Sequence, residues 1–397
     1  MQTQLPEQLL ATDHGQRADA ILRSCVHCGF CNATCPTYQL LGDELDGPRG
    51  RIYLIKDFLE TQEQSPRLHQ HLDRCLTCRA CETTCPSGVQ YGELLEIARS
   101  EMSDDRTAWD RLVIAGLKYF VPNRIRFRVV VQLGNLFRRW LPQQLRQHVP
   151  PLGMKAEMVT SNSHARKIVL LGGCVQSVST PEVNQALRRL LEARNIECVE
   201  LAGEGCCGSL ALHLGDDKAA IKAMAANVEA LGPAAAGAEA IISTASGCGV
   251  TVKDYGRHLA ATPLAKRAAS FSDKTMDVAE YLADSRLTFS AAMPGKRIAW
   301  HSPCSLQHGQ RVRDPVEKIL KATGYVLTEV PDRHLCCGSA GTYSLLQGTI
   351  ANELRERKLN ALGSDSPDLI ATANVGCQLH LASAAGVPVV HWLQLLR

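Results

Sequence analysis

The sequence contains no long apolar run and almost no excess of charge. No segment reaches the roughly 18 to 20 uninterrupted apolar residues that a membrane-spanning helix requires, so we expect a chain that is soluble or lies peripherally on a membrane. The 397 residues carry a formal net charge of +3. The first residues are polar and acidic and lack the features of a secretory signal peptide, which argues against a secreted, disulfide-stabilised domain.

Several kinds of functional motif are missing as well. The chain shows no convincing flavin or nicotinamide site and no nucleophile placed beside a general base. No nucleic-acid-binding motif accompanies its basic residues. We therefore predict that this chain carries no catalytic residues of its own and has no nucleic-acid partner.

Cysteine, in contrast, is abundant, with 17 residues, far more than ordinary packing in a reducing compartment explains. Eight of them form two runs of the same spacing: Cys25-x2-Cys28-x2-Cys31-x3-Cys35-Pro36 and Cys75-x2-Cys78-x2-Cys81-x3-Cys85-Pro86. This is the spacing of bacterial ferredoxins, in which three close thiolates hold one [4Fe-4S] cube and the fourth ligates the other cube. It predicts two clusters, one held by Cys25, Cys28, Cys31 and Cys85, the other by Cys75, Cys78, Cys81 and Cys35.

Disulfides and zinc are weaker explanations of these runs. A disulfide framework belongs to an oxidising compartment. Tetrahedral zinc needs four ligands and has no use for a third cysteine followed by a fourth before proline. Because iron-sulfur clusters are assembled and kept in reducing surroundings, we expect a cytoplasmic protein, with peripheral attachment to the cytoplasmic face of the inner membrane left open.

Charge divides the first 150 residues into two parts. Residues 1–104 contain 9 basic and 15 acidic side chains, whereas residues 106–150 contain 9 basic and 1 acidic. Between the two cysteine runs, Arg51–Glu60 has helical apolar spacing, so we expect an α-helical ferredoxin-type domain over residues 1–104. The basic block mixes arginines with apolar residues, and we expect a basic amphipathic linker over 105–163 that packs as a connector, docks a partner or lies on anionic lipid.

The rest of the chain contains a second repeat. Four cysteines recur at offsets of 130, 130, 130 and 129 residues: Cys174, Cys206, Cys207 and Cys248, then Cys304, Cys336, Cys337 and Cys377. The cysteines follow short apolar runs typical of strands, such as 167–171 and 297–300, with helix-like stretches at 182–194 and 315–322 between them. This alternation predicts parallel sheets with the cysteines in one crevice beyond the strand ends. We expect two α/β cysteine-rich domains, over residues 164–295 and 296–397, and an α+β multidomain chain as a whole.

One stretch imitates a dinucleotide site. Residues 203–208 (GEGCCG) match the glycine pattern of nucleotide-binding turns. The matching stretch of the second copy, residues 333–338 (RHLCCG), keeps both cysteines and loses two of the three glycines. Since the repeat retains the cysteine pair, we expect no nucleotide there.

Two ferredoxin runs followed by two copies of Cys-x31-Cys-Cys-Gly resemble the iron-sulfur subunits that accompany flavin dehydrogenases of 2-hydroxy acids and glycerol 3-phosphate, and also heterodisulfide reductase. The resemblance covers nearly the whole chain and is strongest to the glycolate-oxidising branch of this family. It is carried by residues 25–51 (CVHCGFCNATCPTYQLLGDELDGPRGR), 73–89 (DRCLTCRACETTCPSGV) and 334–343 (HLCCGSAGTY).

The resemblance implies an electron-transfer role in a complex. In this family separate FAD-bearing subunits oxidise the substrate, here glycolate to glyoxylate, and the iron-sulfur subunit carries the electrons to an acceptor such as a membrane quinone. The alternatives are an iron-sulfur subunit of a glycerol 3-phosphate or lactate dehydrogenase, and a thiol/disulfide enzyme similar to heterodisulfide reductase.

The role of the eight repeated cysteines stays open from sequence. In heterodisulfide reductase similar repeats bind an unusual cluster, but each ends in Cys-x-x-Cys, which neither copy does here. A further iron-sulfur cluster, a set of free thiols or quinone-facing pocket, and a redox-active thiol site all agree with the pattern. Four histidines beside the motifs could tune a potential or donate a proton, and a fifth, His380, could supply a ligand; the four are His27, His301, His308 and His334.

Overall fold

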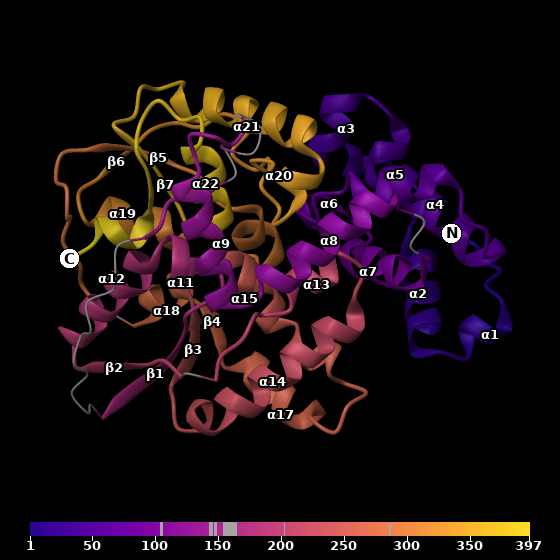
Figure 1. Ribbon diagram of the computed structural model, residues 1–397, viewed down its shortest axis with the longest axis horizontal. Coiled ribbons are helices and arrows are strands. Elements are labelled where there is room, and N and C mark those ends of the chain that lie inside the picture. The colour runs from indigo at the N-terminus through magenta and orange to yellow at the C-terminus, as the bar shows by residue number, and fades with distance from the viewer. Residues whose placement is uncertain (104–105, 143–145, 147–148, 154–164, 202, 286) are drawn as a thin grey trace.

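The computed structural model describes residues 1–397 except 104–105, 143–145, 147–148, 154–164, 202 and 286, and consists of a helical region and two α/β repeats (Figure 1). Part of the expected linker, including residues 154–163, lies outside the described residues. In Figure 1 the N-terminal helices lie at the right and the two sheets at the left.

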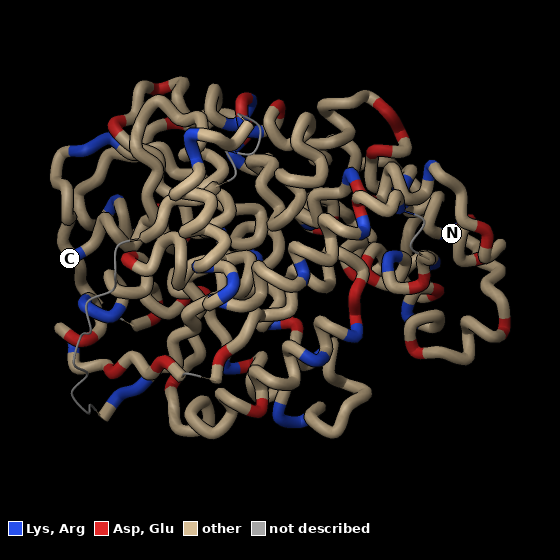
Figure 2. Tube along the Cα trace, in the orientation of Figure 1, with Lys and Arg blue, Asp and Glu red and all other residues tan. Residues whose placement is uncertain are grey.

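The N-terminal region consists of short helices joined by tight turns. They are α1 Glu7–Leu10, α2 Asp13–Ser24, η1 Phe30–Thr34, α3 Pro36–Leu41, η2 Glu44–Asp46, α4 Pro48–Thr61, α5 Pro66–Asp73, α6 Ala80–Thr84 and α7 Tyr91–Glu101. Pro36, Pro48 and Pro66 begin their helices, where a missing N–H costs no hydrogen bond. The helix predicted at 51–60 is confirmed as the longer α4, and the excess of acidic side chains in this region is visible in Figure 2.

Two further helices form most of the described part of the basic block. These are α8 (Ala108–Phe120) and α9 (Arg124–Leu136), and each buries a single residue. Large apolar side chains remain exposed on this α8–α9 face, at 64% to 83% of their surface; they are Trp109, Leu112, Ile125, Leu136 and, just beyond α9, Trp140. Among the described helices, none has both the length and the apolar character needed to cross a bilayer.

Each repeat contains a four-stranded parallel sheet, in the orders β2-β1-β3-β4 and β6-β5-β7-β8. The strands are β1 Arg166–Leu171, β2 Ile196–Val199, β3 Ala240–Ser243, β4 Thr275–Asp277, β5 Arg297–Trp300, β6 Val326–Leu327, β7 Leu369–Thr372 and β8 Val389–His391. The predicted α/β repeats are thereby confirmed. In each sheet the order reverses beside the first strand, so the loops after β1 and β3, and after β5 and β7, open a crevice at the carboxyl edge.

Helices cover both faces of each sheet. The first repeat contains α11 Gln176–Ser179, α12 Pro181–Glu192, α13 Ser209–His213, α14 Asp217–Ala236, α15 Ser246–Lys253, α16 Tyr255–His258, α17 Ala265–Asp273 and α18 Val278–Asp284. The second contains η3 Ser305–Gly309, α19 Pro315–Ala322, α20 Tyr343–Leu346, α21 Gly348–Gly363, α22 Val375–Ala382 and η4 Trp392–Leu395. The helix predicted at 315–322 is confirmed with those bounds as α19, and the one at 182–194 corresponds to α12.

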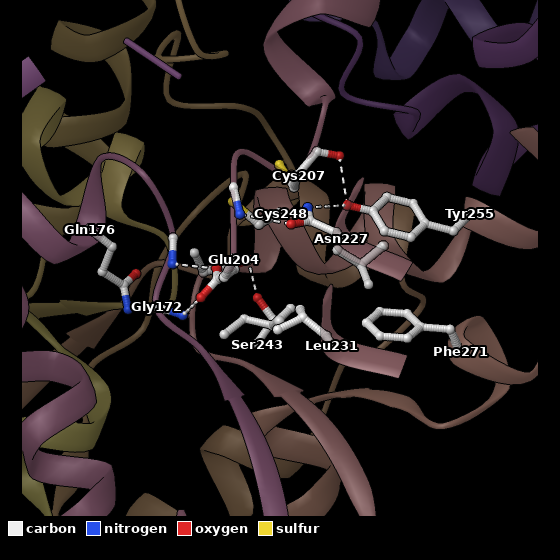
Figure 3. Close-up of a pocket in the computed structure, with 15 residues that line it drawn as sticks. Gly172, Gln176, Glu204, Cys207, Asn227, Leu231, Ser243, Cys248, Tyr255 and Phe271 are labelled. Atoms are coloured by element: carbon white, nitrogen blue, oxygen red, sulfur yellow. Dashed lines mark hydrogen bonds between the residues drawn. The ribbon is translucent and has the colours of Figure 1, made fainter. Parts of the chain in front are cut away.

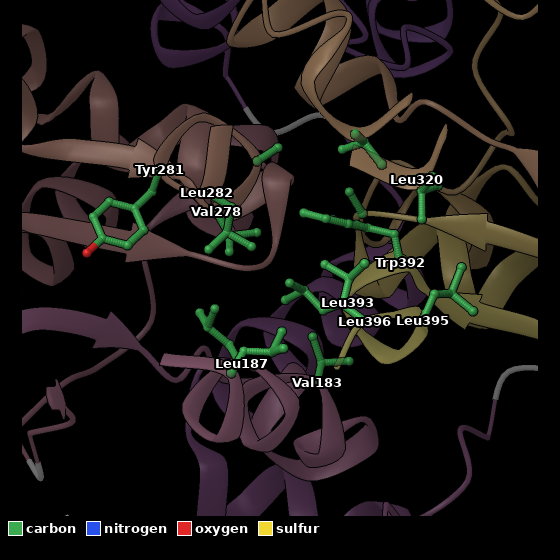
Figure 4. Close-up of a cluster of buried hydrophobic side chains, with 14 of the residues drawn as sticks. Val183, Leu187, Val278, Tyr281, Leu282, Leu320, Trp392, Leu393, Leu395 and Leu396 are labelled. Atoms are coloured by element: carbon green, nitrogen blue, oxygen red, sulfur yellow. The ribbon is translucent and has the colours of Figure 1, made fainter. Parts of the chain in front are cut away.

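The two repeats share one hydrophobic core. Trp392 and Leu393 near the C-terminus pack with Leu187 of α12 and Leu282 of α18, as Figure 4 shows, and all four side chains are almost fully buried. The same cluster reaches both sheets through Ile168 and Ile298. Because neither repeat encloses this core alone, the crevices of the two sheets are held in a fixed relation.

Loops of the two repeats also interlock beside the cysteines. The N–H of Ser246 donates to the carbonyl oxygen of Ala373 at 3.1 Å, and the hydroxyls of Ser246 and Ser305 are 2.8 Å apart. His391 is fully buried, and its Nε2 lies 2.9 Å from the carbonyl oxygen of Thr244, while its Nδ1 accepts from the N–H of Leu393 at 3.3 Å. The ring is therefore held as the neutral tautomer that carries its proton on Nε2.

This histidine predicts acid destabilisation. Burial lowers the pKa of His391 to about 4, against about 6.5 in an unfolded chain. As the pH falls from 6.5 to 4 the unfolded chain takes up this proton before the folded protein does, which costs the folded state about 3 kcal/mol when complete. We expect the difference between the thermal unfolding midpoints at pH 7 and pH 5 to be smaller in His391→Gln than in the native chain.

The matched control is His14→Gln, because the His14 side chain is 52% exposed. This control should keep the native difference between the two midpoints. If this difference were unchanged in His391→Gln, groups other than this ring would cause the loss of stability between pH 7 and pH 5.

Candidate metal centres

The first predicted quartet of cysteines meets around one pocket. Cys25, Cys28 and Cys31 come from the first run and Cys85 from the second, and all four line the same cavity with Ile52 and Tyr91. Burial and then the neighbouring Cys25 raise the pKa of the Cys31 thiol to about 11. Four thiolates this close are therefore unfavourable without a cation, and a donor set of this kind fits a [4Fe-4S] cluster.

The second quartet lines an adjacent pocket. Cys75, Cys78 and Cys81 of the second run share it with Cys35 of the first. The two loops turn in the same way, since both have left-handed backbone at matching positions: His27 and Gly29 in one, Thr77 and Arg79 in the other. The last cysteine of each run thus reaches the pocket of the other, as the spacing predicts, while metal ligation itself stays a prediction.

A buried ionic group adjoins the second quartet. Arg51 is 1% exposed, with its Nη1 3.9 Å from Cys35 Sγ and its Nε donating to the carbonyl oxygen of His71 at 2.7 Å. Asp46 is fully buried and accepts from Arg51 at 3.4 Å and from Arg74 at 2.8 Å. Burial alone would lower the pKa of Arg51, but the adjacent Cys75, Tyr91 and Cys35 raise it overall. A permanent positive charge therefore lies beside this pocket, and charge of that kind tunes a cluster potential.

In the first repeat the cysteines gather at the carboxyl edge of the sheet. Cys174 follows β1 and its Sγ lies 3.9 Å from Cys206 Sγ in the loop after β2. Hydrogen bonds from the thiols of Cys174 and then Cys207 lower the pKa of Cys206. Hydrogen bonding of this kind favours the thiolate, which is the form that binds metals.

The second repeat repeats this arrangement and adds an imidazole. Cys304 Sγ lies 3.8 Å from Cys336 Sγ. Cys337 and Cys377 are both buried, and a ring nitrogen of His301 lies within 4.8 Å of both their sulfur atoms. His380, in contrast, has its Nε2 3.2 Å from the carbonyl oxygen of Ala351. Among the described residues, His301 is the histidine whose ring forms a compact group with two of these thiols, while His380 lines the cavity that Cys377 also lines.

A cavity of about 670 Å³ connects the two repeats with the second ferredoxin loop. It is lined by seven of the eight repeated cysteines, Cys174, Cys206, Cys207, Cys248, Cys304, Cys336 and Cys377, and by Cys78. Leu117 and Val121 at the end of α8 and Phe127 of α9 also line it. Sequence spacing predicted a crevice in each copy, but it did not predict that both open into one space.

The second ferredoxin loop packs directly on the second repeat. Leu76 is buried in a cluster with Cys336, Tyr343 and Leu354, and Cys78 packs against it. The Tyr343 hydroxyl donates to the carbonyl oxygen of Arg74 at 3.0 Å, and Thr83 Oγ1 is 2.8 Å from His308 Nδ1. Arg79 also pairs with Asp254 of the first repeat at 3.0 Å. The second quartet is therefore placed next to Cys304 and Cys336.

The glycine-rich stretch 203–208 is tied to neighbouring segments, and the N–H of Gly205 donates to Asn227 Oδ1 at 2.8 Å. The carboxylate of Glu204 accepts from the N–H groups of Gly172 and Gly173 at 2.8 and 2.9 Å, as Figure 3 shows for Gly172. Arg124 of α9 pairs with the same carboxylate at 2.6 Å. The N–H groups of Gly172 and Gly173, which follow β1, are thus already paired with a carboxylate of the chain.

Two crossed cysteine quartets on a helical domain, docked on a duplicated cysteine-rich α/β unit, define an iron-sulfur electron carrier. Family models agree: a 4Fe-4S dicluster domain matches residues 21–89, and a cysteine-rich domain matches residues 168–253 and 298–382. The chain is 47% identical over 400 residues to the glycolate oxidase iron-sulfur subunit of Escherichia coli (strain K12), covering 100% of this chain and 98% of that protein. It belongs to the family of glycolate oxidase iron-sulfur subunits, and within an oxidoreductase of this kind it is the electron carrier.

More distant proteins share the architecture. A probable glycolate oxidase iron-sulfur subunit of Bacillus subtilis (strain 168) is 27% identical over 91% of this chain and 88% of that protein. One subunit of a fumarate reductase (CoM/CoB) from Methanothermobacter marburgensis is 26% identical over 94% of this chain and 72% of that protein. A solved structure of a hypothetical protein from Helicobacter pylori covers 98% of this chain and 72% of that chain with a TM-score of 0.57 and 8% identity, which shows a common fold alone.

Proposed function

We propose that the chain relays electrons singly from a flavin subunit that oxidises glycolate, through the two cysteine quartets and then the second repeat, to a membrane quinone. The observation that carries this order is the packing of Leu76 and Cys78 against Cys336. It makes the second quartet the neighbour of the repeats, and among the described residues the cavity shared by the repeats is lined by Cys78 of this quartet and by no cysteine of the first. In the first quartet, Cys28 is exposed, and an exposed ligand suits electron entry from a partner subunit.

The two quartets have assigned roles in this proposal. Cys25, Cys28, Cys31 and Cys85 hold one [4Fe-4S] cluster, and Cys75, Cys78, Cys81 and Cys35 hold the other. Bound clusters change by one electron with little rearrangement, which suits a hand-over between a two-electron flavin and a quinone. The loops and Arg51 fix the positions and surroundings of these ligands. FAD belongs to the partner subunits in this scheme.

We assign a further iron-sulfur centre to the repeated cysteines. The support is chemical: thiols at 3.8 and 3.9 Å in matching places, a lowered pKa at Cys206, and N–H donors at the sulfurs. Gly338 N–H, for example, donates to Cys336 Sγ at 3.5 Å. Sites with clustered thiolates bind soft metal centres. Without a metal, thiolates this close would repel one another.

The iron content tests this centre. Two cubes require about eight iron atoms and eight acid-labile sulfides per chain, and a further four-iron centre raises the count towards about twelve. We expect the anaerobically purified chain to exceed eight, and Cys336→Ser/Cys337→Ser to return it towards eight because two ligands are removed.

Cys198→Ser is the matched control, since Cys198 lies on β2 outside both cysteine sets and its replacement should leave the iron unchanged. A native count near eight, or an undiminished count in the double variant, would contradict a third centre.

Electron entry can be measured in the reconstituted complex. With the flavin subunits present, glycolate should bleach the cluster absorbance of this chain, because its oxidation to glyoxylate releases two electrons and two protons. The quinone takes up the same number, so its addition should restore the absorbance. Bleaching by lactate or glycerol 3-phosphate in place of glycolate would assign the chain to another dehydrogenase.

We further propose that the α8–α9 face attaches the complex to the membrane surface. The exposed Trp and Ile side chains of this face lie among arginines, which is the composition of helices that insert at the interface of anionic bilayers. The face lies on helices that line the shared cavity, so attachment there brings a lipid-dissolved quinone towards the repeats.

Vesicle binding tests the attachment. The native chain should cosediment with phosphatidylserine vesicles, and Ile125→Glu/Trp140→Glu should weaken this binding about tenfold or more, because each buried side chain is worth about 1.5–3 kcal/mol. Val326→Glu, at a residue 57% exposed on β6, is the control and should bind normally. Failure of the native chain to bind would instead assign this face to a protein partner.

A further inference from the structure

His301 is a buried histidine beside the cysteines of the second repeat. It directly follows β5, and its main-chain N–H donates to the carbonyl oxygen of Ala371 at 2.8 Å, which fixes its position beside β7. The residue is 1% exposed, and neither Nδ1 nor Nε2 has a partner among the described residues. A buried polar ring left unpaired is costly, so a ligand or metal that pairs with a ring nitrogen would stabilise the residue here.

The neighbours of this ring are metal-binding groups. A ring nitrogen of His301 and the sulfur atoms of Cys337 and Cys377 all lie within 4.8 Å of one another, and all three residues are buried. Asn374 Nδ2 also lies 3.5 Å from Cys377 Sγ, as a donor that stabilises a thiolate. Two thiolates and an imidazole are ligands for one tetrahedral ion or for irons of one cluster.

The first repeat lacks the imidazole. At the offset of 130 that relates three of the four pairs of cysteines, His301 corresponds to Leu171, which packs in the hydrophobic core with Val169 and Leu212. In that copy the Tyr255 hydroxyl donates to the carbonyl oxygen of Cys207 at 3.0 Å, as Figure 3 shows. The two repeats therefore have the same fold and matching cysteines but different chemistry at this position.

We propose that His301 ligates an iron of the centre in the second repeat, together with Cys337 and Cys377, while the first repeat offers cysteine ligands alone. This inference rests on the proposed function, in which the second repeat holds an iron-sulfur centre. A neutral imidazole in place of a thiolate removes negative charge from a cluster and raises its reduction potential. The repeat that contacts Cys78 thereby becomes the favoured destination of electrons from the second quartet.

Nitrogen hyperfine spectroscopy tests the ligand directly. We would label the histidines of the full chain with 15N, reduce the anaerobically purified protein, and record pulsed EPR spectra. The native chain should show a strongly coupled histidine nitrogen. The coupling should vanish in His301→Leu, which installs the residue of the first repeat, and should persist in the control His380→Leu.

Two further measurements separate ligation from packing. His301→Leu should lower iron by about a third, from about twelve towards about eight per chain. His301→Cys should keep the iron, lose the nitrogen coupling and titrate at a lower potential, because a thiolate replaces the imidazole.

The outcomes also separate this inference from the proposed function. A native count near eight iron atoms removes the third centre, and the inference with it. Extra iron in the native chain, with coupling and iron retained in His301→Leu, overturns the imidazole ligand and leaves the relay standing. One zinc per chain in place of the extra iron, or loss of the coupling in His380→Leu alone, overturns the assignment as well.

Discussion

The packing of Leu76 and Cys78 against Cys336 is the contact on which the arrangement of the cysteine sets depends. It joins a helical domain and an α/β repeat that are unrelated in fold, and the hydrogen bond from Tyr343 to Arg74 fixes their orientation. Because both partners are cysteine loops, the same apolar contact that stabilises the interface also brings two sets of thiols together. The side chains that stabilise this interface are therefore also the ones that set the distance between the two sets of cysteines.

The two repeats have the same fold, but several residues at the carboxyl edges of their sheets differ. Both sheets have the same strand order, and one shared core around Trp392 holds them as a pair. Yet a histidine faces the thiols in one copy where a leucine fills a core in the other, and Glu204 closes the first loop where His334 stands in the second. A duplicated scaffold in this way presents two matching sets of cysteines with different neighbours around one cavity.

Positive charge is placed differently in the helical domain and on the α8–α9 helices. The acidic helical domain holds Arg51 buried beside its second quartet, whereas the basic α8–α9 helices keep their cations and large apolar side chains at the surface. A buried cation acts on a neighbouring metal centre through a low-dielectric medium, while exposed cations act on partners and lipid headgroups. Arg124 is a cation of α9 that points inward instead, because it pairs with the carboxylate of Glu204 in the first repeat.

The sequence by itself determined the ligand types, the two ferredoxin runs, the duplication and most element positions, because short-range spacing encodes loop geometry and apolar periodicity encodes strands and helices. The sequence indicated that Cys35 joins the second quartet and Cys85 the first only because the ferredoxin motif is known to exchange its last cysteines. The tertiary structure alone decided that both repeats open into one cavity, that Cys78 adjoins the second repeat, and that His301 lies against Cys337 and Cys377. These are contacts between residues far apart in the chain, and they depend on how the domains pack, which no local spacing specifies.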